Sequence, residues 1–373
     1  MAVYRQITDG DPEGAVAKVL ALVAEALDVQ TICAPFYVTG REAAVVEIRD
    51  AGQELPPVAF LEPSYQFSLA GMLSRMARSS TTVGKMVALL RPCDHRALVE
   101  LAKLRQIPLS SLITVVFECP GTIHARDVVT MDRSSLRRLA QTLVSSHSRE
   151  QESLSVREAC RACLHLDFPV ADVQILWRGA DPWQEIYWRE GCSIGLQALT
   201  SAGLVEAELP EERARNLDRL RKERLAFRQD RIERFSRDYQ GPEGMRRALS
   251  SCIGCMSCRQ VCPLCYCRAC VFHGPDLETP WETAETWLKG RNALRLPLDT
   301  LLYHMVRMNH MAHGCVACGL CGQACPMDVP VDLLFLVGGK SVQEALNYKP
   351  GERPDEQPPQ GTFREDEFTW LGR

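Results

Sequence analysis

Two stretches of the chain carry cysteines at a spacing that is typical of iron-sulfur clusters. The first holds Cys252, Cys255, Cys258 and Cys262 before Pro263, and the second holds Cys315, Cys318, Cys321 and Cys325 before Pro326. In this C-x2-C-x2-C-x3-C-P pattern three thiolates of one loop bind a cubane, and the fourth reaches across to the other cluster. The sequence therefore predicts one [4Fe-4S] cluster on Cys252, Cys255, Cys258 and Cys325, and a second on Cys315, Cys318, Cys321 and Cys262.

Zinc is the main alternative for these cysteines, but a zinc site needs neither the third regularly spaced cysteine nor the proline. Residues 263–314 separate the two motifs, and their last part, 298–311, has the apolar spacing of a helix. This arrangement resembles the helical ferredoxin domains of heterodisulfide-reductase-type and respiratory iron-sulfur subunits, in which clusters form an electron wire.

A third group of cysteines lies earlier in the chain. Cys93 follows the apolar run 85–90, Cys119 follows 113–117, and Cys160 and Cys163 form a C-x-x-C pair. If the two runs are neighbouring parallel strands, Cys93 and Cys119 meet at their carboxyl ends, where open α/β sheets build sites, and the nearby pair completes four ligands. Free cysteine is also a common buried apolar residue, and the residues alone leave both readings open.

The elements that position these cysteines form two predicted domains. In residues 1–210 we expect helices over 15–27, 68–78, 94–105 and 134–146, alternating with strands over 31–39, 43–48, 58–61, 85–90, 113–117 and 171–177. Such alternation predicts an α/β domain with a mainly parallel core. Residues 246–345 form the second domain, a mainly helical two-cluster ferredoxin domain.

Two further segments complete the predicted layout. Residues 211–245 read as a linker helix of interleaved charges with a narrow apolar seam, which is either a solvated connector or a docking surface for another subunit. Residues 346–373 form a tail rich in proline and acidic residues, which we expect to be disordered or ordered by a partner.

Composition excludes several classes of protein. The 43 lysines and arginines against 47 aspartates and glutamates give a net charge of −4, so binding of nucleic acid through a basic surface is not expected. The longest apolar runs fall short of the roughly 20 residues that span a bilayer. The first residues lack the basic and apolar regions of an export signal, and the 17 cysteines are spaced for metal rather than disulfides, so we expect a cytoplasmic protein.

The motifs together resemble a known family over about residues 85–340. The run RPCDHRALVELAKL, then FECPG, ACRAC and CIGCMSCRQVCPLCYCRAC, is similar to the beta subunits of coenzyme F-420 hydrogenases and dehydrogenases, especially the formate dehydrogenase beta subunit. The resemblance implies FAD and a [4Fe-4S] cluster in the α/β domain, and so three clusters in all. It also implies that Cys93, Cys119, Cys160 and Cys163 are the ligands of the N-terminal cluster.

The sequence has no G-x-G-x-x-G loop, so FAD is implied by the resemblance alone. Around the Cys93 turn, where a helix N-terminus favours an anion, the candidate flavin contacts are Lys85, Arg91, His95 and Arg96, although surface solvation explains each equally well. Five of the 17 cysteines are not assigned to a cluster. We expect Cys33 and Cys192 to be core residues. Cys265, Cys267 and Cys270 recur in the subunits that the chain resembles, and they leave a further metal site open.

These parts predict an enzyme subunit. A flavin takes two electrons as hydride and releases them singly to iron-sulfur clusters. We therefore expect an electron-transfer subunit that exchanges electrons with a catalytic formate dehydrogenase or hydrogenase subunit and hydride with a small carrier such as the deazaflavin coenzyme. The alternative is a non-enzymatic electron-transfer adaptor that links such a subunit to a heterodisulfide-reductase-like bifurcating complex.

Overall fold

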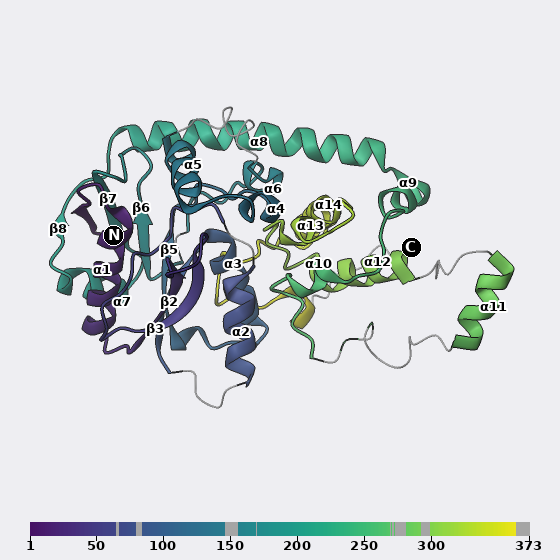
Figure 1. Ribbon diagram of the computed structural model, residues 1–373, viewed down its shortest axis with the longest axis horizontal. Helices are drawn as coiled ribbons and strands as arrows, with labels where there is room; N and C mark the ends of the chain where they lie inside the picture. Colours follow the sequence, from purple (N-terminus) through teal and green to yellow (C-terminus); the bar gives the residue numbers. More distant parts are fainter. Residues whose placement is uncertain are drawn as a thin grey trace.

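The computed structural model describes residues 1–64, 67–79, 84–145, 156–168, 170–268, 270, 272, 281–291 and 299–362. Figure 1 shows a sheet domain at one end, a helical region carrying the later cysteines beside it, and one long helix that runs along both. No helix within these residues has both the length and the apolar character that a membrane span requires.

A single mixed sheet forms the centre of the first domain. Its strands are β1 (Val3–Ile7), β2 (Thr31–Phe36), β3 (Val45–Asp50), β4 (Met86–Leu90), β5 (Leu112–Phe117), β6 (Val173–Leu176), β7 (Glu185–Glu190) and β8 (Val205–Glu206). They lie in the order β3-β2-β4-β5-β6-β7-β1-β8. The pairs from β2 to β6 are parallel, and every other pair is antiparallel.

The helices of this domain cover both faces of the sheet. They are α1 (Pro12–Ala26), α2 (Leu69–Ser79), α3 (Pro92–Lys103), α4 (Ala125–Val128), α5 (Arg133–Ser145), α6 (Glu158–Arg161) and α7 (Ser193–Ser201), with a 3-10 turn at Leu109–Ser111. One apolar core lies between the sheet and α1 and α7, and a second lies between the sheet and α2 and α3. Every residue of β4 and β5 is buried, as expected for parallel strands covered on both faces.

The expectation of a mainly parallel core therefore holds only for the four strands β2, β4, β5 and β6. The predicted strand 58–61 is wrong, because Val58 makes only an isolated bridge to Phe36 after the pair Pro56-Pro57, and proline cannot donate to a sheet. The helix expected from Asp94 begins earlier, at Pro92, because proline suits the first turn of a helix. Strands β1, β7 and β8 and helix α7 were not anticipated.

The second region is helical. Its elements are α9 (Gly241–Ala248), α10 (Ser257–Gln260), α11 (Trp281–Arg291), α12 (Asp299–Met311), α13 (Leu320–Gln323), α14 (Val331–Ala345) and a 3-10 turn at Pro359–Gly361. Leu298, with which we expected the helix of 298–311 to begin, lies outside the described residues. Leu264 and Val316 of this region belong to the same apolar core as α2 and α3, so the two regions pack directly on one another.

Helix α8 (Glu212–Asp238) lies within the segment expected to be a linker. It also makes ion pairs with both the α/β domain and the helical region. Three of its arginines are buried. Arg213 pairs with Glu118 at the end of β5 at 2.6 Å, and Arg231 bridges Glu158 of α6 at 2.8 Å and Asp332 of α14 at 3.2 Å. Figure 1 shows α8 spanning both regions.

The beginning of the predicted tail is also packed against the protein's own chain. The Tyr348 hydroxyl donates to the Glu100 carboxylate of α3 at 2.7 Å, and the Gly351 amide donates to the same group at 2.8 Å. Gly351 has φ +76°, and a side chain there would collide with Arg96. Residues 348–351 are therefore packed against α3 of the same chain, while the tail from residue 363 lies outside the described residues.

Replacing Arg213 by alanine leaves Glu118 buried without its cation. We expect the free energy of unfolding to fall by about 3 kcal/mol, measured by denaturation in urea. The matched control is Arg219→Ala on the exposed face of the same helix, for which a change below about 0.5 kcal/mol is expected. Equal losses in the two variants would show that the Arg213 pair contributes nothing beyond a surface contact.

Candidate iron-sulfur centre

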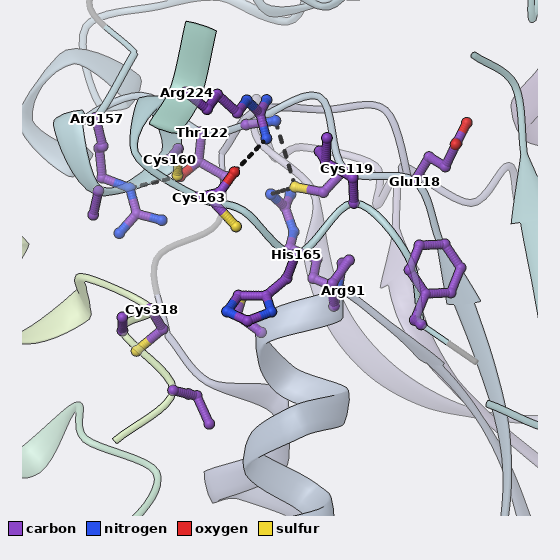
Figure 2. A pocket seen from close by; sticks show the side chains of 18 of the residues that line it. Arg91, Glu118, Cys119, Thr122, Arg157, Cys160, Cys163, His165, Arg224 and Cys318 are labelled. Carbon is purple, nitrogen blue, oxygen red and sulfur yellow. Dashed lines mark hydrogen bonds between the residues drawn. The ribbon is translucent and has the colours of Figure 1, made fainter. Parts of the chain in front are cut away.

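The four N-terminal cysteines line one cavity at the carboxyl ends of β4 and β5. Cys93 lies in the first turn of α3, and Cys119 lies two residues beyond the end of β5. Cys160 lies in α6, and Cys163 just after it. All four contribute to the wall of a cavity with an empty volume of about 650 Å³, which includes its mouth. Figure 2 shows Cys119, Cys160 and Cys163 around this space.

Donors contact the cysteine sulfurs of this cavity. The Gly121 amide donates to Cys119 Sγ at 3.4 Å, and the Arg91 guanidinium lies 3.6 Å from the same atom. The Thr122 hydroxyl is 3.3 Å from Cys160 Sγ. Figure 2 marks the contacts that the Arg91 and Thr122 side chains make. Hydrogen bonds of this kind stabilise thiolates and tune the clusters that thiolates hold.

The electrostatics of the cavity combine buried thiols with cations. Burial, and then the charge of Asp94, raise the pKa of the Cys93 thiol well above its ordinary value. Burial also raises the pKa of Cys163, whereas at Cys160 the opposing effects of Arg157 and Thr122 outweigh burial and lower the pKa. The cavity wall includes the arginines Arg91, Arg157, Arg178 and Arg224. A set of thiolates that is neutralised by iron and by these cations fits the site, because a buried anionic group needs compensating charge.

One cysteine of the ferredoxin region reaches the same cavity. Cys318 lies on its wall together with Val316 and Ala317, and Figure 2 shows Cys318 on a segment separate from those of the N-terminal cysteines. The approach is close, since a side-chain carbon at Gly319 would collide with that of Ala159, next to Cys160. The second cysteine loop therefore abuts the N-terminal set directly.

The two ferredoxin-type loops repeat one backbone conformation. Gly254 and Met256 in the first loop have φ of +70° and +58°, and Ala317 and Gly319 at the equivalent places of the second have +55° and +73°. Each pair flanks the second cysteine of its motif. Left-handed residues other than glycine cost energy and are retained where the surrounding structure requires them.

Among the described residues, no three His, Cys, Asp or Glu side chains lie close enough together to hold a metal ion as they stand, although most of the predicted cluster ligands are near one another. Charge interactions join Cys252 to Cys255, Cys258 and Cys325, which is the first predicted set. They also join Cys315, Cys318 and Cys321 of the second set to one another. Cys262, the fourth member of the second set, lies beside Cys265 and Arg307.

Helix α12 supplies side chains to these cysteines that sequence reasoning missed. The Tyr303 hydroxyl is 3.5 Å from Cys258 Sγ, and His304 Nε2 is 3.4 Å from Cys252 Sγ. The Arg307 guanidinium donates to Cys258 Sγ at 3.1 Å. The one available signal was the placement of Tyr303, His304 and Arg307 in a helix that leads into a cysteine motif, since residues four apart share a helix face.

Of the four predicted flavin contacts, only Arg91 lies on the cavity. Lys85 is exposed and precedes β4, so the length of that strand separates it from the Cys93 turn. Arg96 is buried and donates to the carbonyl oxygens of Val316 and Pro350, and so joins the two regions. His95 is buried on α3, and burial lowers its pKa to about 4, which leaves it neutral.

A second cavity shares Arg91 with the first. It has an empty volume of about 520 Å³, and its walls include Pro35, Val46, Leu89 and Phe117. Glu62 is 1% exposed on the wall, and its Oε2 has no hydrogen-bond partner among the described residues. Apolar walls with a few buried polar groups are typical of cofactor sites.

The chain is similar to known redox proteins. Residues 248–329 match the 4Fe-4S dicluster domain family. The chain is 26% identical to F420-dependent formate dehydrogenase subunit beta of Methanocaldococcus jannaschii over 72% of this chain and 74% of that protein. It is 27% identical to F420-dependent formate dehydrogenase 1 subunit beta of Methanococcus maripaludis over 74% of this chain and 75% of that protein.

Among solved structures the chain is similar to one from the F420-reducing [NiFe] hydrogenase complex of Methanosarcina barkeri. The TM-score is 0.45 and the identity 14%, over 65% of this chain and 94% of that chain. The relatives are subunits of oxidoreductases, and the predicted resemblance to their family is confirmed. A mixed α/β sheet domain followed by a 4Fe-4S dicluster region is the part of the predicted fold that is confirmed.

Replacing Cys163 by serine tests the N-terminal ligand set. We expect iron to fall by about four atoms per chain, one cubane's worth, while the electron paramagnetic resonance (EPR) signals of the ferredoxin pair persist. Cys192 is exposed, so the expectation that it is a core residue is wrong. It serves as the control, and its replacement by serine should leave the iron content unchanged. Full iron content in the Cys163 variant would return these four cysteines to the role of buried apolar residues.

Proposed function

We propose that this homologue of F420-dependent formate dehydrogenase beta subunits is the electron-transfer subunit of a cytoplasmic formate dehydrogenase or hydrogenase complex. In this proposal it carries three [4Fe-4S] clusters and FAD, and interconverts hydride and single electrons. The cluster ligands are the twelve cysteines named above, with Cys93, Cys119, Cys160 and Cys163 in the α/β domain. The proposed partner is a catalytic subunit that acts on formate or hydrogen, because the proteins similar to this chain are named as parts of formate dehydrogenases and a hydrogenase.

One observation carries the proposal. Four cysteines from three separate segments line a single cavity, and Cys318 of the second ferredoxin-type loop lies on its wall. Such convergence supports an N-terminal cluster placed next to the second loop. A chain of closely spaced clusters is what electron transfer between two distant reactants requires.

The position of the first loop supports exchange with another protein. Cys255 is exposed, and Ile253 beside it is 62% exposed. The cysteine sites thus run from the interior of the α/β domain, through the second loop, to a first loop at the surface. We assign the surface end to the catalytic partner, because single electrons pass between proteins only where a cluster lies near the interface.

We assign the second cavity to the ring of a flavin. When bound, FAD would exchange hydride with a carrier and single electrons with a neighbouring cluster. The apolar walls at Leu89 and Phe117 would cover the ring and exclude water, while Glu62 Oε2 could accept a hydrogen bond from it. Arg91 would link the flavin site to the Cys119 loop. Its guanidinium donates to the Glu62 carbonyl oxygen at 2.8 Å and lies 3.6 Å from Cys119 Sγ.

The test compares the full chain, loaded with iron-sulfur clusters and FAD, with its Cys163→Ser variant. We expect the wild type to oxidise reduced F420 or NAD(P)H and to show reduced ferredoxin-type clusters by EPR. In the variant, flavin bleaching by the carrier should persist while cluster reduction slows, because the first cluster after the flavin is missing.

The adaptor reading predicts a different outcome for the same samples. The wild type would retain no flavin after reconstitution and exchange no hydride, yet its clusters would accept electrons from a reduced viologen. That result would overturn the converter and favour an adaptor to a heterodisulfide-reductase-like complex. Stoichiometric zinc with little iron would overturn both readings.

A further inference from the structure

The side chains between the two ferredoxin-type loops form a connected polar group. Arg307 on α12 is only 3% exposed, and its guanidinium donates to Cys258 Sγ at 3.1 Å and to the Cys258 carbonyl oxygen at 3.2 Å. The same guanidinium lies 4.9 Å from the ring centre of Phe335 and 5.5 Å from that of Tyr303. The two rings and the carbonyl fix its position, because a guanidinium stacks on aromatic faces while its N–H groups donate in a fixed plane.

Cys265 extends this group towards the other predicted cluster. Its backbone amide donates to the Cys262 carbonyl oxygen at 3.3 Å, and its thiol lies near enough to Cys262 and Arg307 for their charges to interact. Arg307 also interacts with the charges of Cys258, Cys262 and Cys265. Cys258, Arg307, Cys265 and Cys262 therefore lie together, and they include one predicted ligand of each cluster.

We propose that Arg307 and Cys265 are positioning residues that set the reduction potentials of the two ferredoxin-type clusters. Arg307 acts on the cluster held by Cys258, and Cys265 acts on the cluster held by Cys262. The proposal rests on the iron-sulfur function proposed above. It also gives a role to Cys265, which lies outside both C-x2-C-x2-C-x3-C-P motifs.

The physical reason lies in the charge that a cluster gains on reduction. In the transfer step one cluster loses an electron and the other gains it, and no bond is made or broken. The driving force is therefore the difference between the reduction potentials of the two clusters. A donor to a ligand sulfur stabilises the reduced, more negative form and raises the potential. A buried cation acts more strongly than an exposed one, because little water screens it.

The experiment is a potentiometric titration of the full, cluster-loaded chain, followed by EPR. In Arg307→Met we expect the ratio of reduced to oxidised cluster at a fixed potential to fall at least about tenfold for the Cys258 cluster, which is about 59 mV for one electron. Arg307→Lys, which keeps the charge, should recover part of the shift. The exposed Arg246→Gln is the matched control and should leave both potentials unchanged.

Cys265 is tested by a pair of variants. Cys265→Ala removes the donor and should lower the potential of the cluster held by Cys262, whereas Cys265→Ser keeps an O–H donor and should stay near the wild type. The exposed Cys267→Ser is the control.

Iron content separates the possible failures. Loss of one cluster's iron in Cys265→Ala would make Cys265 a ligand and overturn its proposed role. Unchanged potentials at full iron content in Arg307→Met and Cys265→Ala would overturn the whole inference. If Arg307→Met does not fold, Arg307→Lys and Cys265→Ala replace it. Wild-type reduction potentials in both of these variants would also overturn the inference. A wild type without iron would instead refute the proposed function.

Discussion

The hydrogen bonds of Arg96 hold the second cysteine loop against the α/β domain. Its guanidinium is 8% exposed and donates to the carbonyl oxygens of Val316 and Pro350. Burying a guanidinium is costly unless its N–H groups find acceptors, and here two backbone segments supply them. Because Val316 precedes Cys318 by two residues, one side chain of α3 fixes both the position of that loop and the docking of the tail. The juxtaposition of the N-terminal and ferredoxin-type cysteines depends on this contact.

Helix α8 belongs to the candidate centre as much as to the frame of the molecule. Its Arg224 donates to the Cys163 carbonyl oxygen at 3.2 Å and lines the cysteine cavity, while Arg213 neutralises Glu118 on the same wall. The wall thereby keeps an excess of cations beside the cysteines. Such an excess favours thiolates and the additional negative charge of a reduced cluster. The charges that made this helix look like a solvated connector are, at these positions, buried and paired.

Local patterns predicted the central strands, most of the helices and the cysteine groups, because β4 and β5 are continuous apolar runs and the motifs have fixed spacing. The flanking strands β1 and β7 escaped notice because their partners are remote in sequence and their polar residues mask the alternation, as in Glu185–Glu190. Arg96 looked like an anion contact because its position near a helix N-terminus is readable from sequence, whereas its carbonyl acceptors, some 220 and 254 residues away, are not. The same limit hid Arg307, whose role depends on how α12 packs.

The position of β1 also bears on how the chain is made. Residues 3–7 leave the ribosome well before their partners, which are residues 185–190 on one side and Val205 and Glu206 on the other. During synthesis this strand therefore stays unpaired until residues 185–206 have emerged, and an unpaired strand is prone to wrong association. The cysteines up to Cys163 are all made within that interval, before Cys318 exists to close their cavity. The order of translation thus leaves the cavity that the N-terminal cysteines line without one of its walls until the second loop has been made.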